Sequence, residues 1–206
     1  MPARERGRWS AEAIRRALKL YAVTDNAWLG ERSLAQCVEA ALAGGATFVQ
    51  LREKELAGEA LLAEAREIQA LCRRYRVPFV IDDDVALARQ IDADGVHVGQ
   101  SDMEAQKARA LLGGDKILGV SAQTVEQAVL AEQNGADYLG VGAAFVTGTK
   151  TDAKPISRET IRAITAAVDI PVVAIGGIHK ENILQLKGTG VDGVALVSAI
   201  FAADDI

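Results

Sequence analysis

Short runs of apolar residues, many of them β-branched, alternate with longer amphipathic segments along the whole chain. Most of these short runs are continuously apolar, which is typical of strands buried on both faces in a parallel sheet. The pattern predicts eight strands, at residues 20–24, 46–52, 78–82, 94–98, 116–120, 137–142, 171–176 and 192–197.

The segments between the predicted strands have helical periodicity. Residues 59–75 and 124–135 are clear examples, and the second has Thr124 at its N-cap position and Gly135 just past its end. Eight strands alternating with helices in 206 residues predict an α/β fold, a (β/α)8 TIM barrel, as a single domain over residues 1–206. A doubly wound open sheet is the alternative, but no GxGxxG motif follows the first strand.

The two ends of the chain add detail to this barrel. Residues 10–20 predict an extra N-terminal helix that closes the bottom of the barrel. Only residues 199–206 follow the eighth strand, so we expect a short or truncated eighth helix.

Composition and charge narrow the class of protein. Hydrophobic residues make up 50% of the chain and charged residues 25%, as in ordinary globular proteins. The net charge of −5 disfavours nucleic-acid and membrane partners. Cys37 and Cys72 lie in helix-like segments, where we expect buried thiols. With no signal peptide and no spanning apolar run, we expect a cytoplasmic protein; a homo-oligomer is left open.

The unusual polar residues follow the ends of predicted strands, where such barrels hold their active sites. Gln50, Arg52 and Lys54 have period-two spacing, so all three side chains can point the same way. A polar series with two cations at the end of a buried strand suits a polyanion.

Acidic residues follow the next two predicted strands. Asp82, Asp83 and Asp84 end the third strand, and Asp102 follows the fourth. One carboxylate from each strand could meet on a hard cation such as Mg²⁺. Helix capping is the competing interpretation, which we favour for Asp84 but not for Asp83 or Asp102.

The later loops offer groups that suit a phosphate. Ser121 lies at the tip of the fifth strand, where it could also be a simple helix cap. The longest loop, residues 142–155, contains the sequence TGTK at Thr147 to Lys150. Gly176 and Gly177 follow the seventh strand, and Ser198 follows the eighth, where such barrels often bind phosphate. Two anion sites are therefore predicted, one with a metal and cations for a pyrophosphate and one without metal for a monophosphate.

Taken together, these motifs resemble those of the thiamine-phosphate synthase family. The likeness runs in order through YAVTD (21–25), VQLREK, DDV, GVHVGQSD, GVSA, YLGVG, the TGTK loop, AIGGI and GVALVSAIF, and covers nearly the whole chain. It implies a transferase of thiamine biosynthesis with Mg²⁺ as cofactor. In the implied reaction, hydroxymethylpyrimidine diphosphate loses pyrophosphate and the thiazole phosphate nitrogen attacks the exposed methylene carbon.

The resemblance also implies roles for individual residues. The metal ligands would be Asp83 and Asp102. The catalytic residues would be Arg52, Lys54, Ser121 and Lys150. The pyrimidine diphosphate would contact Gln50, Leu51, Arg52, Glu53, Lys54, Asp82, Ser121 and Lys150. The thiazole phosphate would contact Thr147, Gly148, Thr149, Gly177, Val197 and Ser198.

The chain departs from the family pattern at two places. Family members often have Asn where this chain has Asp82, and an ionised Asp accepts hydrogen bonds but cannot donate them. The long loop also lacks the prolines expected near Ala143 and Val146.

Two other functions are weighed against the synthase. The related thiazole tautomerase shares the barrel but uses a histidine after the fifth strand, where this chain has Gln123, and lacks the acidic pair. A non-catalytic phosphate-sensing barrel would not need Asp83, Asp102 and Lys54 together. His97 and His179 are expected to be structural, the first inside the barrel and the second near a helix start.

Overall fold

A computed structural model describes residues 4–5, 8–147 and 155–206. Its strands are β1 (Arg4–Glu5), β2 (Arg8–Trp9), β3 (Leu20–Val23), β4 (Phe48–Leu51), β5 (Phe79–Asp82), β6 (Gly95–Val98), β7 (Ile117–Ala122), β8 (Tyr138–Val141), β9 (Val172–Ile175) and β10 (Gly193–Leu196). Its helices are α1 (Ala11–Ala17), α2 (Leu34–Ala43), α3 (Gly58–Tyr75), α4 (Val85–Gln90), α5 (Ala105–Leu112), α6 (Val125–Gln133), α7 (Arg158–Ala167) and α8 (Ser198–Phe201), with 3-10 helices η1 (Asn26–Trp28) and η2 (Ile183–Leu186).

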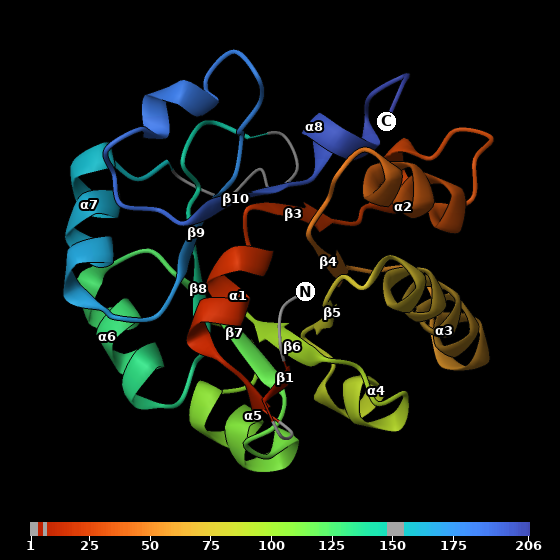
Figure 1. Ribbon diagram of the computed structural model, residues 1–206, viewed down its shortest axis with the longest axis horizontal. Helices are drawn as coiled ribbons and strands as arrows, with labels where there is room; N and C mark the ends of the chain where they lie inside the picture. Colours follow the sequence, from red (N-terminus) through yellow and green to blue (C-terminus); the bar gives the residue numbers. More distant parts are fainter. Residues whose placement is uncertain (1–3, 6–7, 148–154) are drawn as a thin grey trace.

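Strands β3 to β10 form a closed parallel barrel, in which β10 pairs with β3 and every other strand pairs with its neighbours in sequence. The larger helices surround it (Figure 1). The predicted TIM barrel is confirmed, and each of the eight predicted strands contains or overlaps one of these. The short hairpin of β1 and β2 was not predicted. The last helix is short, as expected, and a 3-10 helix follows β9 in place of an α-helix.

Helix α1 closes one end of the barrel, as predicted from residues 10–20 (Figure 1). Ser10 caps it by accepting a hydrogen bond from Ala13 N at 3.1 Å. Ile14 and Leu18 pack with the barrel-interior residues Phe48 and Tyr138 in one apolar cluster. The lower barrel is therefore a dry, packed core, and a polar site can form only at the opposite end.

Strand β4 shows how the two faces of each strand divide. Phe48 belongs to the interior cluster, whereas Val49 and Leu51 belong to the larger core between the strands and the surrounding helices. Gln50 faces inward one step above Phe48 and lines a cavity. Because side chains alternate along a strand, the interior changes from apolar to polar within two inward-facing residues.

A repeated hydrogen bond ties the barrel strands together in pairs at their amino ends. The side chain of the residue just before β4, β6, β8 and β10 accepts a hydrogen bond at 2.8–3.0 Å. The donor is the backbone N–H of the first or second residue of the preceding strand. The bonds are Leu20 N to Thr47 Oγ1, Phe79 N to Asp94 Oδ2, Leu118 N to Asp137 Oδ2 and Val172 N to Asp192 Oδ2. The acidic residues that open several predicted strands therefore satisfy backbone donors at the end of the barrel opposite the cavity.

The remaining sequence-based expectations concern the two cysteines, the cap of one helix and membrane-spanning segments. Cys37 and Cys72 are buried, as predicted, and burial raises the pKa of the Cys72 thiol. Thr124 caps α6 and Gly135 follows its end with a φ of 87°. None of the described helices has both the length and the apolar character needed to cross a bilayer.

Candidate active site

A cavity of about 350 Å³ lies at the carboxyl ends of the barrel strands. It brings together predicted site residues from seven of the eight barrel strands and the loops after them. These are Gln50, Arg52, Lys54, Asp82, Asp83, Asp102, Ser121, Thr147, Gly177, Val197 and Ser198. Gly148, Thr149 and Lys150 lie outside the described residues.

Two predicted contacts, Leu51 and Glu53, do not line the cavity. Leu51 points away from the barrel interior and is 1% exposed in the outer core. Glu53 Oε1 accepts hydrogen bonds from Glu55 N at 2.6 Å and Leu56 N at 3.0 Å, and its other oxygen accepts from Asn26. Glu53 thus shapes the loop after β4, and ligand contact by Leu51 and Glu53 stays a prediction.

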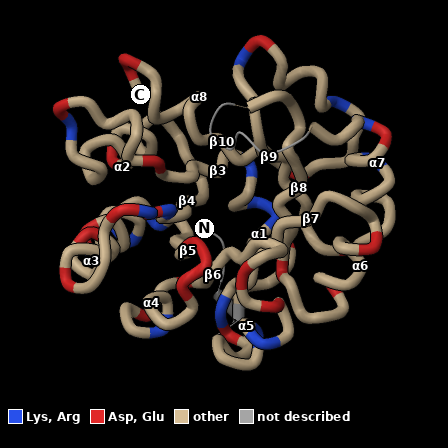
Figure 2. Tube along the Cα trace, turned by 180° about the vertical axis from the view of Figure 1, so that it is seen from behind, with Lys and Arg blue, Asp and Glu red and all other residues tan. Residues whose placement is uncertain are grey.

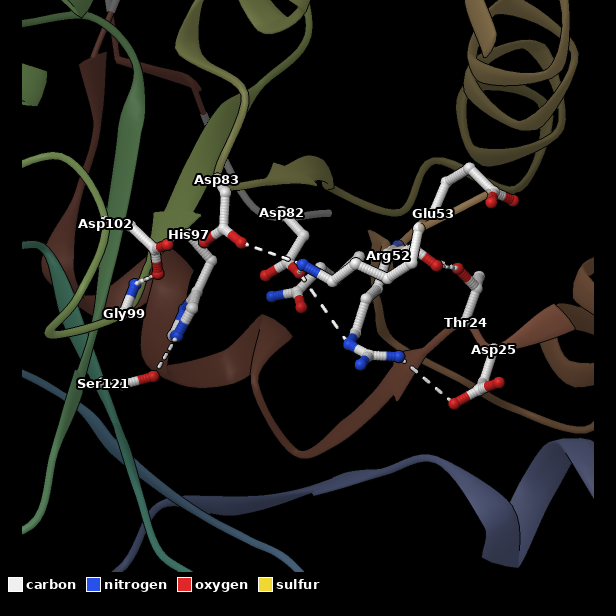
Figure 3. Close-up of polar contacts among 12 residues, drawn as sticks. Thr24, Asp25, Arg52, Glu53, Asp82, Asp83, His97, Gly99, Asp102 and Ser121 are labelled. Atoms are coloured by element: carbon white, nitrogen blue, oxygen red, sulfur yellow. Dashed lines mark hydrogen bonds and ion pairs between the residues drawn. The ribbon is translucent and has the colours of Figure 1, made fainter. Parts of the chain in front are cut away.

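Cations and carboxylates alternate where β4 and β5 end (Figures 2 and 3). Lys54 Nζ lies 3.1 Å from Asp83 Oδ2 and 3.4 Å from Asp82 Oδ2. Arg52 lies 3.2 Å from Asp25 Oδ2 through one terminal nitrogen and 3.9 Å from Asp82 Oδ2 through Nε. These pairs hold both cations at the cavity wall, in position to meet an anionic ligand.

The crowding of charges shifts two pKa values. Burial, together with repulsion from Asp83, raises the pKa of Asp82 to about 6, against the attraction of Lys54 and Arg52. Burial alone would lower the pKa of Lys54, but its hydrogen bond to Asp83 and the attraction of Asp82 outweigh burial and raise it. Lys54 therefore remains a cation, whereas Asp82 changes charge close to the neutral range.

The three consecutive aspartates have three different environments. Asp82 ends β5 with an inward-facing carboxylate. Asp83 has a φ of 61° and donates its backbone N–H to His97 O at 2.8 Å. That left-handed conformation is unfavourable for most residues but tolerated by Asp and Asn. Asp84 caps α4 by accepting from Leu87 N at 2.8 Å, which confirms the capping interpretation at this position.

Asp102 and Asp83 come from neighbouring loops and lie on the same side of the site (Figure 3). Asp102 Oδ2 accepts a hydrogen bond from Gly99 N at 3.0 Å, and Glu104 occupies the N-cap of α5, so Asp102 does not cap that helix. The part of the chain that the structure describes contains no group of three or more His, Cys, Asp or Glu side chains suited to a metal. A site with two carboxylates fits Mg²⁺, which commonly takes its other ligands from water and substrate phosphates.

The floor of the cavity is a connected set of polar side chains that the sequence analysis did not assemble. Gln50 Nε2 donates to the Tyr21 hydroxyl at 2.6 Å, which lies 2.8 Å from the Tyr138 hydroxyl. His97 follows, with Nδ1 at 3.0 Å from Tyr138 Oη and Nε2 at 2.9 Å from Ser121 Oγ. His97 is inside the barrel as predicted, and Ser121 contacts it from within β7 instead of capping a helix. The period-two spacing of Tyr21 and Val23 was the available signal for Tyr21.

The opposite side of the cavity is made largely of backbone. Gly177 has a φ of 65°, and a Cβ there would lie 2.3 Å from Val146 O. Phe145 N donates to Gly176 O at 3.0 Å, so the loop after β8 packs directly on the end of β9. Thr147, Val197 and Ser198 line the same part of the cavity, where a monophosphate was predicted.

Comparisons with known proteins point to one family. The thiamine monophosphate synthase family model matches residues 20–200. The chain is 50% identical over 195 residues to the thiamine-phosphate synthase of Clostridioides difficile, covering 95% of this chain and 93% of that one. It is 51% identical over 187 residues to that of Ruminiclostridium cellulolyticum, covering 91% and 89%.

A solved structure is similar at the level of the whole fold. The thiamine phosphate pyrophosphorylase from Pyrococcus furiosus superposes with a TM-score of 0.85 at 41% sequence identity, covering 93% of this chain and 91% of that one. The match of the family model over most of the chain, together with relatives of about half-identical sequence, settles the family. This chain belongs to the thiamine monophosphate synthase family.

Proposed function

We propose that the protein joins hydroxymethylpyrimidine diphosphate to thiazole phosphate, forming thiamine phosphate and releasing pyrophosphate. The observation behind this proposal is the division of one cavity into two unlike halves. Strands β4 to β6 supply two cations and the acidic pair, and β8 to β10 supply the glycine corner and hydroxyls. Two phosphorylated substrates can therefore bind side by side, and their reacting atoms meet above the polar floor.

The diphosphate half suits a leaving pyrophosphate. Arg52 and Lys54 are held by carboxylates at 3.1–3.4 Å, so they need little reorganisation to meet charge that develops on the departing oxygen. Gln50 and Ser121 line the same cavity as this cluster, where they can orient the pyrimidine ring. No general base is required, because the attacking thiazole nitrogen already has a free electron pair.

The acidic pair is the proposed holder of Mg²⁺. Asp83 and Asp102 would contribute one ligand each, and the remaining positions would go to water and diphosphate oxygens. When bound, the ion would neutralise charge on the diphosphate. Lys54 contacts Asp83 in the described structure, so the ammonium occupies the neighbourhood that the ion and the diphosphate would share.

The decisive assay follows both products with purified protein and both substrates, in the presence of Mg²⁺ or of EDTA. We expect thiamine phosphate and pyrophosphate to form in equal amounts, and EDTA to abolish both. Asp83→Asn removes a metal ligand yet preserves the left-handed backbone, because Asn tolerates that conformation as Asp does. Its loss of activity should be at least about 100-fold, because losing an outer-shell partner of a metal ligand already costs about 10- to 100-fold.

The neighbouring residue gives a matched control. Asp84→Asn makes the same chemical change one position away and retains an N-cap for α4. It should leave activity within about two-fold of the parent, since Asn and Asp cap nearly equally. If the folded protein formed neither product, the synthase proposal would be wrong, and the tautomerase and the phosphate-sensing barrel would have to be tested next.

A further inference from the structure

The floor of the cavity forms a continuous hydrogen-bonded chain across the barrel. It connects Gln50, Tyr21, Tyr138, His97 and Ser121, with successive separations of 2.6, 2.8, 3.0 and 2.9 Å. The side chains come from five strands, in the order β4, β3, β8, β6 and β7. We call this chain the floor relay. Both of its ends, Gln50 and Ser121, line the cavity.

The direction of the floor relay follows from the number of protons available. Gln50 Nε2 can only donate, so the Tyr21 oxygen accepts, and if the Tyr21 proton goes to Tyr138 every donor along the chain has an acceptor. Burial raises the pKa of both tyrosines well above the usual value, so each phenol keeps its one proton. Tyr138 then donates to His97 Nδ1, which must be unprotonated. His97 holds its proton on Nε2 and donates it to Ser121 Oγ.

The opposite direction is disfavoured by one unsatisfied group. A proton on His97 Nδ1 would make Tyr138 an acceptor there, so Tyr138 would donate to Tyr21. The Tyr21 oxygen would then accept two bonds, and its own proton would have no acceptor within the described part of the chain. Tyr21 is 1% exposed, and a buried donor without a partner loses its hydration with nothing in return.

The barrel is shaped around the floor relay. A Cβ on Gly119 would lie 2.2 Å from Tyr138 Cζ and 2.5 Å from His97 Nδ1, so only glycine leaves room for both rings. Phe48 packs against Tyr21 and Tyr138 with ring centroids 4.6 and 5.6 Å away. The aromatic contacts fix the two phenols from below, and the hydrogen bonds fix their hydroxyls.

We propose that the floor relay directs the Ser121 hydroxyl, so that Ser121 donates a hydrogen bond to an acceptor atom of the bound pyrimidine diphosphate. Because Ser121 Oγ accepts from His97, its own O–H points away from the ring, toward the cavity that Ser121 lines. Tyr138 is fully buried and does not line the cavity, so it acts through its neighbours as a positioning residue. This role rests on the proposed function, whereas the direction of the floor relay does not.

The first experiment measures the proton on His97 in the ligand-free full chain. The sequence contains two histidines, so ¹⁵N-labelled ring signals near about pH 8 separate into two sets, and His179→Gln identifies the exposed one. We expect His97 as the neutral Nε2–H tautomer. An Nδ1–H tautomer would overturn the proposal, because His97 Nε2 would then accept the Ser121 proton. A doubly protonated ring would also overturn it, because Tyr138 could then not donate to His97 Nδ1. This result does not depend on catalysis, so it stands apart from the test of synthase activity.

The second experiment connects the floor relay to the reaction. Tyr138→Phe removes one hydroxyl and keeps the ring, and Tyr75→Phe is the matched control because Tyr75 ends α3 at the surface. Tyr138→Phe should lower kcat/KM for the pyrimidine diphosphate about ten-fold, the effect of losing one hydrogen bond to a charged group, and leave the KM for thiazole phosphate unchanged.

A double-mutant cycle separates this role from a loss of packing. If Tyr138 acts through Ser121, Tyr138→Phe should cause no further loss in a Ser121→Ala background. Independent, additive losses would overturn the proposal, as would a Tyr138→Phe variant in which the His97 tautomer is unchanged. If Tyr138→Phe did not fold, the tautomer of the parent protein would still decide the direction.

Discussion

Replacing Asp82 by Asn should stabilise the protein increasingly as the pH rises. The Asp82 side chain is 14% exposed, and its pKa is raised from 3.8 to about 6 by burial and by Asp83. A raised pKa means that the folded state binds the proton more tightly than the unfolded state does. The contribution of Asp82 to stability is therefore complete below about pH 4 and is lost as the pH rises through about 6.

The size of the effect follows from this window. A difference of roughly two pKa units corresponds to about 3 kcal/mol between the protonated and ionised extremes. Between about pH 5 and about pH 8, roughly one unit of that difference is expressed, or about 1.4 kcal/mol. Asn resembles the protonated carboxyl in size and charge but does not titrate. The stability of Asp82→Asn relative to the parent should therefore rise by about 1.4 kcal/mol over this interval.

Urea unfolding at both pH values measures the change directly, provided that the m-values of variant and parent agree. Asp115→Asn, on the exposed turn before β7, makes the same substitution and controls for general effects of lost negative charge. A stability difference that stays constant between the two pH values, or that grows toward acid, would refute the electrostatic reasoning. A constant difference would mean that the attraction of Lys54 and Arg52 balances burial of the Asp82 carboxylate, and growth toward acid that it outweighs burial.

Three further predictions test the packing of the floor and the charges of the site. Gly119→Ala should destabilise the protein by about 1–3 kcal/mol in urea unfolding, because its Cβ would meet Tyr138 at 2.2 Å; Gly114→Ala, which meets no atom within 4 Å, should not. Asp102→Asn should raise the Mg²⁺ concentration for half-maximal activity about ten-fold or more in a metal titration, and an unchanged midpoint would count against Asp102 as a ligand. Lys54→Gln should lower kcat/KM for the pyrimidine diphosphate about ten-fold or more in steady-state kinetics, whereas equal loss for both substrates would argue for a general structural role.

Some of the fold and of the candidate site could be predicted because the chemistry is local in sequence. Strands buried on both faces must be continuously apolar, so the eight runs predicted the barrel directly. The carboxyl ends of all eight strands then meet at one end, which is why Arg52, Asp83 and Ser198 could be expected in a single cavity. Period-two spacing also predicted that Gln50, Arg52 and Lys54 share one side.

Other features depend on contacts between distant residues, which no sequence pattern reports. Glu53 and Leu51 lie within the same short motif as Arg52, yet one caps a turn and the other packs outward. Tyr21 and Tyr138 are 117 positions apart, and only closure of the barrel brings their hydroxyls to 2.8 Å. The sequence by itself determined the repeating architecture, because apolar periodicity is a local property. Only the tertiary structure decided the floor relay and the pKa of Asp82, because hydrogen-bond direction and burial depend on which side chains from separate strands come to face one another.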